Sequence, residues 1–254
     1  MKNNKAVSSR FYPTKDISVL QLLEMHALFV QYYNNASLEN FIKDMGKKTG
    51  AFILEDKANK NIIGFSTWTE LDLSYDGKSA LGIFSGDTVI AKEYWGNKNL
   101  QRSFAKRMLI TKLKKPNQKV FWLLISKGYK TYLLLTNNFL NFYPCHQTHN
   151  QKLESIVDDY CVQLYPEAYC QKNRLLNFGD GYQNLKDGVA GITSEMKEQN
   201  RDIHHFEQLN PTWAKGTELP CVGEVSIATL LDFIKRNMIP FKKPTSRLRA
   251  LGLS

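Results

Sequence analysis

The stretch GDTVIAKEYWGNKNLQRSFAKRML, residues 86–109, holds the most decisive information about the fold. Its first half contains β-branched and aromatic residues, which favour a strand, and Gly96 marks a turn. After the turn the period becomes helical, because Leu100, Phe104 and Met108 fall on one side and basic residues on another. The stretch therefore predicts a strand, a short loop and a basic amphipathic helix.

The flanking sequence extends this pattern in both directions. Residues 19–33 and 38–48 have helical periodicity, and residues 49–56, 61–72 and 78–94 predict three consecutive antiparallel strands. Downstream, residues 119–126 form a continuously apolar segment, which is typical of a strand buried on both faces. A further helix is predicted over residues 131–143, ending before Pro144. The fold class is therefore α/β (α+β), a mixed central sheet flanked by helices.

Two parts are expected in the chain. Residues 1–150 carry the pattern above, and residues 151–254 are expected to be a C-terminal extension that packs on this core and shapes the acceptor side of a site. The extension predicts helices over 150–166 and 193–209, a strand over 218–226 and a last amphipathic helix capped by Ser226.

Charge is concentrated in one segment. The 254 residues include 34 Lys and Arg against 24 Asp and Glu, a net charge of +10, and residues 92–130 alone carry 11 basic residues and one acidic residue. Such a field attracts a polyanionic partner, or it is simply a solvated helix face. A globular protein is indicated by 43% hydrophobic residues, and disordered and fibrous classes are excluded. No apolar run approaches the length of a membrane-spanning helix, and no secretory signal is apparent, so we expect a cytoplasmic protein.

The order of elements over residues 16–144 resembles the GNAT superfamily of acyl-CoA-dependent N-acyltransferases. At the residue level, the stretch 86–109 is similar to the strand, loop and helix with which that family binds the pyrophosphate of its donor. The resemblance implies transfer of an acyl group from acyl-CoA or acetyl-CoA, or from an acidic acyl-carrier protein, to an amine. The sequence does not identify the acceptor, which we expect to be an amine of a small molecule or of a protein.

The resemblance implies donor-binding residues around the start of the basic helix. A helix N-terminus presents unpaired N–H groups and a partial positive charge to a phosphate. Trp95 and Gly96 match the entry of the family's loop, with Trp95 in the place of its arginine, while Lys98 and Leu100 stand at two glycine positions. We therefore expect the donor to be bound by Trp95, Gly96, Asn97, Lys98 and Arg102, with the side chains of Asn97, Lys98 and Arg102 on its phosphate, or else a pocket that no longer holds coenzyme A in the family's usual way.

Two further residues match the family's helix that follows the buried strand. Asn137 and Tyr143 lie near the positions of an asparagine that binds the donor and a tyrosine that protonates the leaving thiolate. A phenol suits this role because its ordinary pKa of about 10 keeps it protonated at neutral pH. The alternative for Tyr143 is an aromatic ring that packs at the end of a helix.

The base that deprotonates the amine is expected to be a carboxylate. Asp87 is the candidate, because a bulge at Ser85-Gly86 would turn it toward a cleft, and Glu70 and Asp72 are its rivals. No metal site is expected, since Cys145, His146 and His149 come without a Cys-x-x-Cys pair.

Two other functions remain open at this stage. One is a catalytically silent GNAT-like module that binds a partner, for which the replaced glycines argue. The other is a basic nucleic-acid-binding protein, which the sequence disfavours because few aromatic residues are interleaved with the basic helix face.

Overall fold

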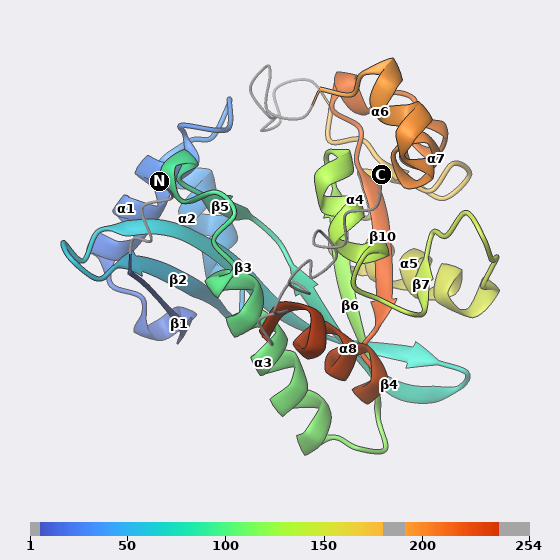
Figure 1. Cartoon of the computed structure of the whole chain (residues 1–254), viewed down its shortest axis with the longest axis horizontal. Helices are drawn as coiled ribbons and strands as arrows, with labels where there is room; N and C mark the ends of the chain where they lie inside the picture. Colours follow the sequence, from blue (N-terminus) through green and yellow to red (C-terminus); the bar gives the residue numbers. More distant parts are fainter. Residues whose placement is uncertain (1–5, 180–190, 239–254) are drawn as a thin grey trace, which may run out of the picture.

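The computed structural model describes residues 6–179 and 191–238, and its main element is an eight-stranded sheet (Figure 1). The strand order is β1-β2-β3-β4-β6-β10-β7, with β5 paired to β3. Among these strands, β4 and β6 run parallel and the other pairs antiparallel. The strands are β1 (Val7–Pro13), β2 (Gly50–Asp56), β3 (Ile62–Tyr75), β4 (Lys78–Ser85), β5 (Thr88–Ile90), β6 (Lys119–Ser126), β7 (Phe142–Tyr143) and β10 (Leu219–Glu224). The α/β class predicted from the sequence is confirmed.

Strand β6 lies in the interior of this sheet, between β4 and β10. Val120, Phe121, Leu123 and Leu124 are all buried, because helices cover both faces at this point. The predicted central position of the apolar run is therefore confirmed.

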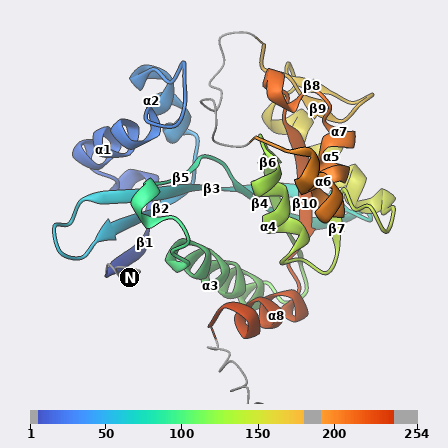
Figure 2. The same ribbon diagram turned by 45° about the horizontal axis from the view of Figure 1, so that its top comes forward.

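Helices cover the two faces of the sheet in separate groups (Figure 2). On one face, α3, α4, α7 and α8 contribute to one hydrophobic cluster with the strands. On the other face, α1 and α2 cover β2, β3 and β5, while α5 covers β4, β6 and β10. The helices are α1 (Val19–Phe29), α2 (Leu38–Gly46), α3 (Asn99–Lys114), α4 (Tyr129–Thr136), α5 (Gln151–Leu164), α6 (Ser194–Gln199), α7 (Arg201–Leu209) and α8 (Ile227–Met238).

The sheet opens where β4 ends. The parallel pairing of β4 with β6 stops at Ser85, opposite Leu124, and the chain then leaves β6 but continues along β3 as β5. Gly86 lies in the break, where an added Cβ would come within 2.6 Å of the Thr67 hydroxyl oxygen. Glycine therefore permits the close approach that lets the chain leave β6 at this point.

One strand from the part of the chain after residue 150, β10, belongs to the main sheet. Strand β10 pairs with both β6 and β7, so residues 144–218, with α5 to α7 and the two-stranded β8 (Tyr169–Cys170) and β9 (Leu175–Leu176), are inserted between two neighbouring strands. Contacts between β10 and β6 therefore join the parts of the chain before and after residue 150, and the role of residues 151–254 in shaping an acceptor site stays a prediction.

Two other elements differ from the sequence predictions. The helix expected to reach residue 143 ends at Thr136, and Phe142–Tyr143 is a short strand, because Tyr143 pairs with Val222 of β10. Strand β1, whose side chains are mostly half-buried, was not predicted from the sequence.

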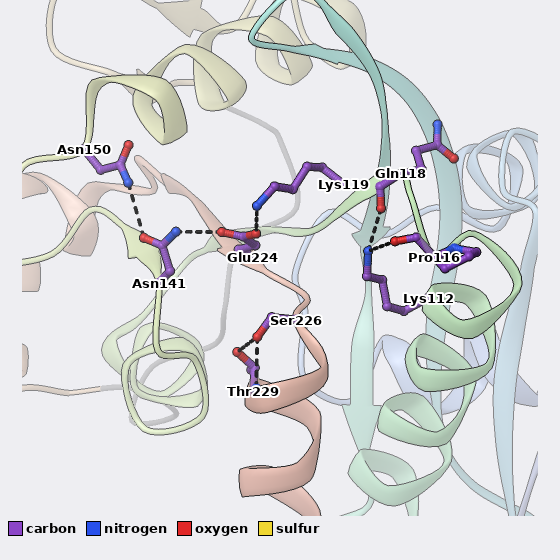
Figure 3. A network of polar contacts seen from close by, with 9 residues as sticks. All are labelled: Lys112, Pro116, Gln118, Lys119, Asn141, Asn150, Glu224, Ser226 and Thr229. Atoms are coloured by element: carbon purple, nitrogen blue, oxygen red, sulfur yellow. Dashed lines mark hydrogen bonds and ion pairs between the residues drawn. The ribbon is translucent and has the colours of Figure 1, made fainter.

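A polar network fixes the junction between β10 and α8 (Figure 3). The Glu224 carboxylate pairs with the Lys119 ammonium at the start of β6 and accepts a hydrogen bond from Asn141 Nδ2 at 2.7 Å. Two residues later, the Ser226 hydroxyl accepts a hydrogen bond from the Thr229 N–H at 3.0 Å, which confirms Ser226 as the cap of α8. Helix α8 is thereby held beside α3 (Figure 2).

Candidate functional site

Two cavities adjoin at the break in β4. The first, which we call the apolar cavity, has a volume of about 120 Å³ and lies between α3, α4 and α8. The second, the polar cavity, has a volume of about 220 Å³ and lies between the α1–α2 side, the end of β6 and the insertion. Both are lined by Ser85, Thr88, Trp122 and Leu134. A molecule in one cavity would therefore meet a molecule in the other at these four residues.

The apolar cavity is walled by side chains from three helices. Phe104 and Met108 come from α3, Phe139 follows α4, and Leu230 comes from α8. Trp122 forms its base, stacked on Phe139 with ring centroids 5.0 Å apart. The Trp122 indole N–H donates to the Ser85 hydroxyl at 2.9 Å, which joins β6 to β4 at the end of their pairing.

The polar cavity gathers five charged side chains from distant parts of the chain. They are Asp44, Lys48, Asp87, Lys127 and Glu218. Two tyrosines, Tyr33 and Tyr165, line it as well. Burial raises the pKa of both phenols above the ordinary value, so both stay neutral.

Glu218 is the most deeply placed carboxylate of this group. Its side chain is 5% exposed, and one carboxylate oxygen lies 3.2 Å from the Lys127 ammonium. Its backbone exchanges two hydrogen bonds of 2.9 Å with Leu176 of β9, which fix it just before β10. Burial raises the pKa of Glu218 to about 7, the nearby Asp87 charge adds to the rise, and Lys127 opposes it. Such a carboxyl exchanges protons at neutral pH, as a general base must.

Asp87 lies beside Gly86 in the break and lines the polar cavity, and its role as the base stays a prediction. Burial raises its pKa, an effect that the ammoniums of Lys48 and Lys127 partly offset. Lys48 itself is paired with Asp44 at 2.9 Å. The alternative candidates for the base, Glu70 and Asp72, line neither cavity.

The raised pKa of Glu218 predicts a pH dependence of stability. The folded protein binds this proton more tightly than the unfolded chain, whose glutamate titrates near 4.5, so the free energy of unfolding should fall as pH rises from about 4.5 to about 7. At about 1.4 kcal/mol per pH unit, the fall amounts to roughly 3 kcal/mol. Glu218→Gln removes the titration. Urea unfolding of both proteins at pH 5 and pH 8 measures the difference, and an equal pH dependence in the two would contradict the assignment.

The residues predicted to bind the donor lie around the N-terminus of α3. Gly96 adopts a positive φ of 84°, and the Asn97 side chain accepts a hydrogen bond from the Asn99 N–H at 2.8 Å. Lys98 occupies the N-cap position, and Arg102 is an exposed residue of the first turns of α3. Their neighbours Leu100 and Gln101 line the apolar cavity. The donor-binding roles themselves stay predictions.

Trp95 and Asn137 flank this region. The Trp95 indole N–H donates to the Ile90 carbonyl at 2.7 Å, and its ring lies 5.6 Å from the Lys130 ammonium at the start of α4. Asn137 is the C-cap of α4, and it is the next residue, Asn138, that lines the apolar cavity.

Tyr143 is separated from the two cavities and lines neither of them. Its phenol hydrogen-bonds with Glu154 of α5, and burial together with this contact raises the pKa of Tyr143 to about 12. Its role as the acid therefore stays a prediction.

Tyr143→Phe separates the two interpretations of this residue, because it removes the proton and keeps the ring. A loss of turnover of roughly 10² to 10⁴-fold in a folded protein is expected if the phenol protonates the thiolate. Full activity in steady-state assays would instead leave water as the proton donor and give the ring a packing role.

Neither a metal centre nor a membrane-spanning helix is found among the described residues. No group of three or more His, Cys, Asp or Glu side chains within residues 6–179 and 191–238 is arranged to hold a metal ion. Over the same part of the chain, no helix has the length and apolarity to cross a membrane.

Several solved structures with a similar arrangement bear names of acyltransferases, and one of them is described as probable. A probable N-acyltransferase from Enterococcus faecalis is 15% identical, with 53% of this chain and 33% of that chain covered and a TM-score of 0.39. A GNAT family N-acetyltransferase from Escherichia coli in complex with CoA is 12% identical over 49% of this chain and 66% of that chain, with a TM-score of 0.35. An acetyltransferase from Trypanosoma brucei is 15% identical over 57% of this chain and 97% of that chain, with a TM-score of 0.37.

The match spans a third of the Enterococcus faecalis protein and just under two thirds of the Escherichia coli protein. No family model matches the sequence, and a search of curated proteins finds no relative.

Proposed function

We propose that this protein is an N-acyltransferase that moves an acyl group from a thioester donor to an amine across the break in β4. The observation that carries this proposal is the pair of adjoining cavities, one apolar and one polar, with Ser85, Thr88, Trp122 and Leu134 lining both. The polar cavity also contains Glu218, a buried carboxyl whose pKa is about 7. The resemblance of residues 16–144 to the GNAT superfamily supports the same activity.

The thioester donor is assigned to the apolar cavity. A fit to a donor is supported by the Gln101 side-chain carbonyl oxygen, which is buried at the cavity wall without a hydrogen-bond partner. Such an atom is costly unless a ligand donates to it. The donor's phosphates would lie at the N-terminus of α3, where Lys98 and Arg102 add positive charge to the helix dipole. Trp95, Gly96, Asn97 and Asn137 would border this path.

The amine acceptor, whether small molecule or protein, is assigned to the polar cavity, with Glu218 as the general base and Asp87 as a carboxylate that tunes it. The amine nitrogen forms a bond with the thioester carbon while its proton passes to Glu218. The tetrahedral intermediate then releases the thiolate, which takes a proton from water; Tyr143, which lines neither cavity, would have to act through intervening water. One amide and one thiol are formed from one amine and one thioester.

The donor class includes acyl-CoA, acetyl-CoA and acyl groups on an acidic carrier protein. The basic segment at residues 92–130 supports an anionic donor, because the charges of α3 surround the start of the donor path. A carrier protein would present a larger acidic surface to this segment than CoA alone.

Removing the positive charge at the start of α3 is expected to weaken donor binding. Charge-assisted contacts to phosphate contribute about 1.5 to 3 kcal/mol each, so Lys98→Ala combined with Arg102→Ala should raise the Kd for acetyl-CoA at least tenfold. The melting temperature should hardly change, because Arg102 is exposed. Calorimetric titration measures the affinity, and an unchanged Kd in the double variant would contradict the phosphate assignment.

Incubation of the protein with acetyl-CoA, longer acyl-CoAs and acyl-carrier protein, each with a mixture of primary amines, tests the function. Mass spectrometry is expected to show a new amide, and a thiol reagent an equal amount of free thiol. Donor binding without either product would favour the catalytically silent module. A protein that binds no donor and forms no product would contradict the proposal.

A further inference from the structure

Strand β9 of the insertion holds the backbone of Glu218 in place. Leu176 of β9 and Glu218 exchange two backbone hydrogen bonds of 2.9 Å. The side chain of Leu176 is fully buried, and β9 pairs in turn with β8, where Tyr169 lies opposite Leu176. A displacement of β9 would therefore move the Glu218 carboxyl relative to the polar cavity.

Arg174, two residues before Leu176, has an uncommon backbone conformation. It ends the turn between β8 and β9 with a positive φ of 53°. This left-handed region is unfavourable for most residues that carry a Cβ, and it persists where surrounding contacts require it. The turn into β9 therefore depends on contacts of Arg174 that lie outside the local sequence.

Two carboxylates of α5 supply those contacts. The Arg174 guanidinium pairs with Glu154, and its Nε lies 3.6 Å from Asp158. Glu154 and Asp158 are four residues apart, so they project from the same side of α5. A guanidinium suits this position because it presents several N–H donors in a fixed plane and can bridge two carboxylates. The same carboxylates also contact Tyr143, His149 and Tyr169.

We propose that Arg174 is a positioning residue for the general base: its ion pairs with α5 fix β9, and β9 holds the Glu218 carboxyl in the polar cavity. This inference rests on the proposed role of Glu218 in acyl transfer. The segment after β9 also contributes Phe178 to the cavity wall, where it packs edge-on against Tyr165 at the end of α5, with ring centroids 5.2 Å apart. Arg174 itself lines neither cavity.

The sign of a pKa change separates positioning from a direct effect of charge. Removing a positive charge near a carboxyl raises its pKa. Loss of positioning acts the other way: burial is the main cause of the raised pKa of Glu218, so water that enters beside a loosened β9 should lower it from about 7 toward 4.5. The titratable and charged side chains that share the cavity with Glu218 are Tyr33, Asp44, Lys48, Asp87, Lys127 and Tyr165.

Arg174→Asn tests the inference, because asparagine tolerates a positive φ but cannot bridge the two carboxylates. The Glu218 carboxyl is titrated by carbon-13 NMR in glutamate-labelled protein, and its signal is assigned by its absence in Glu218→Gln. The midpoint should fall by about one pH unit, a tenfold change in the acidity constant. The acid limb of kcat/KM should move by the same amount, and kcat should fall roughly ten- to a hundredfold. The Kd for acetyl-CoA should stay unchanged.

Three further variants make the result specific. Arg174→Lys keeps a positive charge that can reach one carboxylate, and it should restore part of the shift. Lys152→Asn is the matched control, because Lys152 of α5 pairs with Asp76 at 2.9 Å on the exposed surface, and its midpoint should stay at about 7. If Arg174→Asn does not fold, Asp158→Asn takes its place, since it removes one of the two carboxylates and should shift the midpoint in the same direction by less.

The outcomes separate this inference from the proposed function. An unchanged or raised midpoint in folded Arg174→Asn, with acyl transfer by the wild-type protein, would overturn the inference and leave the proposed function standing. An equal fall in Lys152→Asn would also overturn it. A lowered midpoint in Arg174→Asn, with no amide formed by the wild-type protein, would support the link between Arg174 and Glu218 and overturn the proposed function.

Discussion

Glu218→Gln is expected to lower kcat by roughly 10² to 10⁴-fold in a protein that still folds, because the amide cannot accept the proton of the attacking amine. The wild-type kcat/KM should rise with pH through about 7, where the buried Glu218 carboxyl ionises. Initial rates from pH 5 to pH 9 measure both effects. Glu207→Gln is the matched control, since Glu207 also pairs with a lysine, at 2.8 Å from Lys197, and lies outside both cavities.

The Asp87→Asn variant distinguishes the proposed role of Asp87, which tunes the base, from that of Glu218, which is the base. The Asp87 charge raises the pKa of Glu218, so its removal should move the acid limb of the rate profile to lower pH while most of kcat remains. If kcat falls by roughly 10² to 10⁴-fold in the Asp87→Asn variant while the Glu218→Gln variant stays active, Asp87 rather than Glu218 is the base.

Thr88→Phe is expected to reduce turnover below detection, because Thr88 lines both cavities at the point where donor and acceptor would meet. Misplacement of the reacting groups by about 1 Å costs on the order of 10²-fold, and a phenyl ring there would keep them further apart. Thr88 is exposed, so the cost in stability should be limited to about 1 kcal/mol for the lost bond to Ser66.

Ser74→Phe places the same ring at an exposed position of β3 outside both cavities, and it should keep full activity. Turnover in Thr88→Phe equal to that of Ser74→Phe would show that transfer does not occur at the break in β4.

The parts of the fold that the sequence predicted have strong local signals. The apolar run of β6, the helical period of α3 and the cap Ser226 each depend on a few neighbouring residues. The break near Asp87 was predictable for the same reason, since Gly86 marks it. Strand β1 lacked such a signal, because its mostly half-buried side chains follow no clear alternation.

Glu218 was not predicted because its environment is assembled from distant segments. Its carboxylate meets Lys127 from the end of β6, while the backbone of Glu218 is held by Leu176 of the insertion. The local sequence Thr217-Glu218-Leu219 contains no motif that indicates burial or a lysine partner. The insertion between β7 and β10 could not be predicted from the sequence either, because pairing between strands far apart in sequence leaves no short-range pattern.

The most direct test is a crystal structure of the protein with a non-hydrolysable thioether analogue of acetyl-CoA. The proposed transfer across the break in β4 predicts the carbonyl of the analogue between Thr88 and Trp122, at the boundary of the two cavities, with Glu218 on the far side of the break. An analogue bound elsewhere on the protein, with its carbonyl away from both cavities, would contradict the proposal.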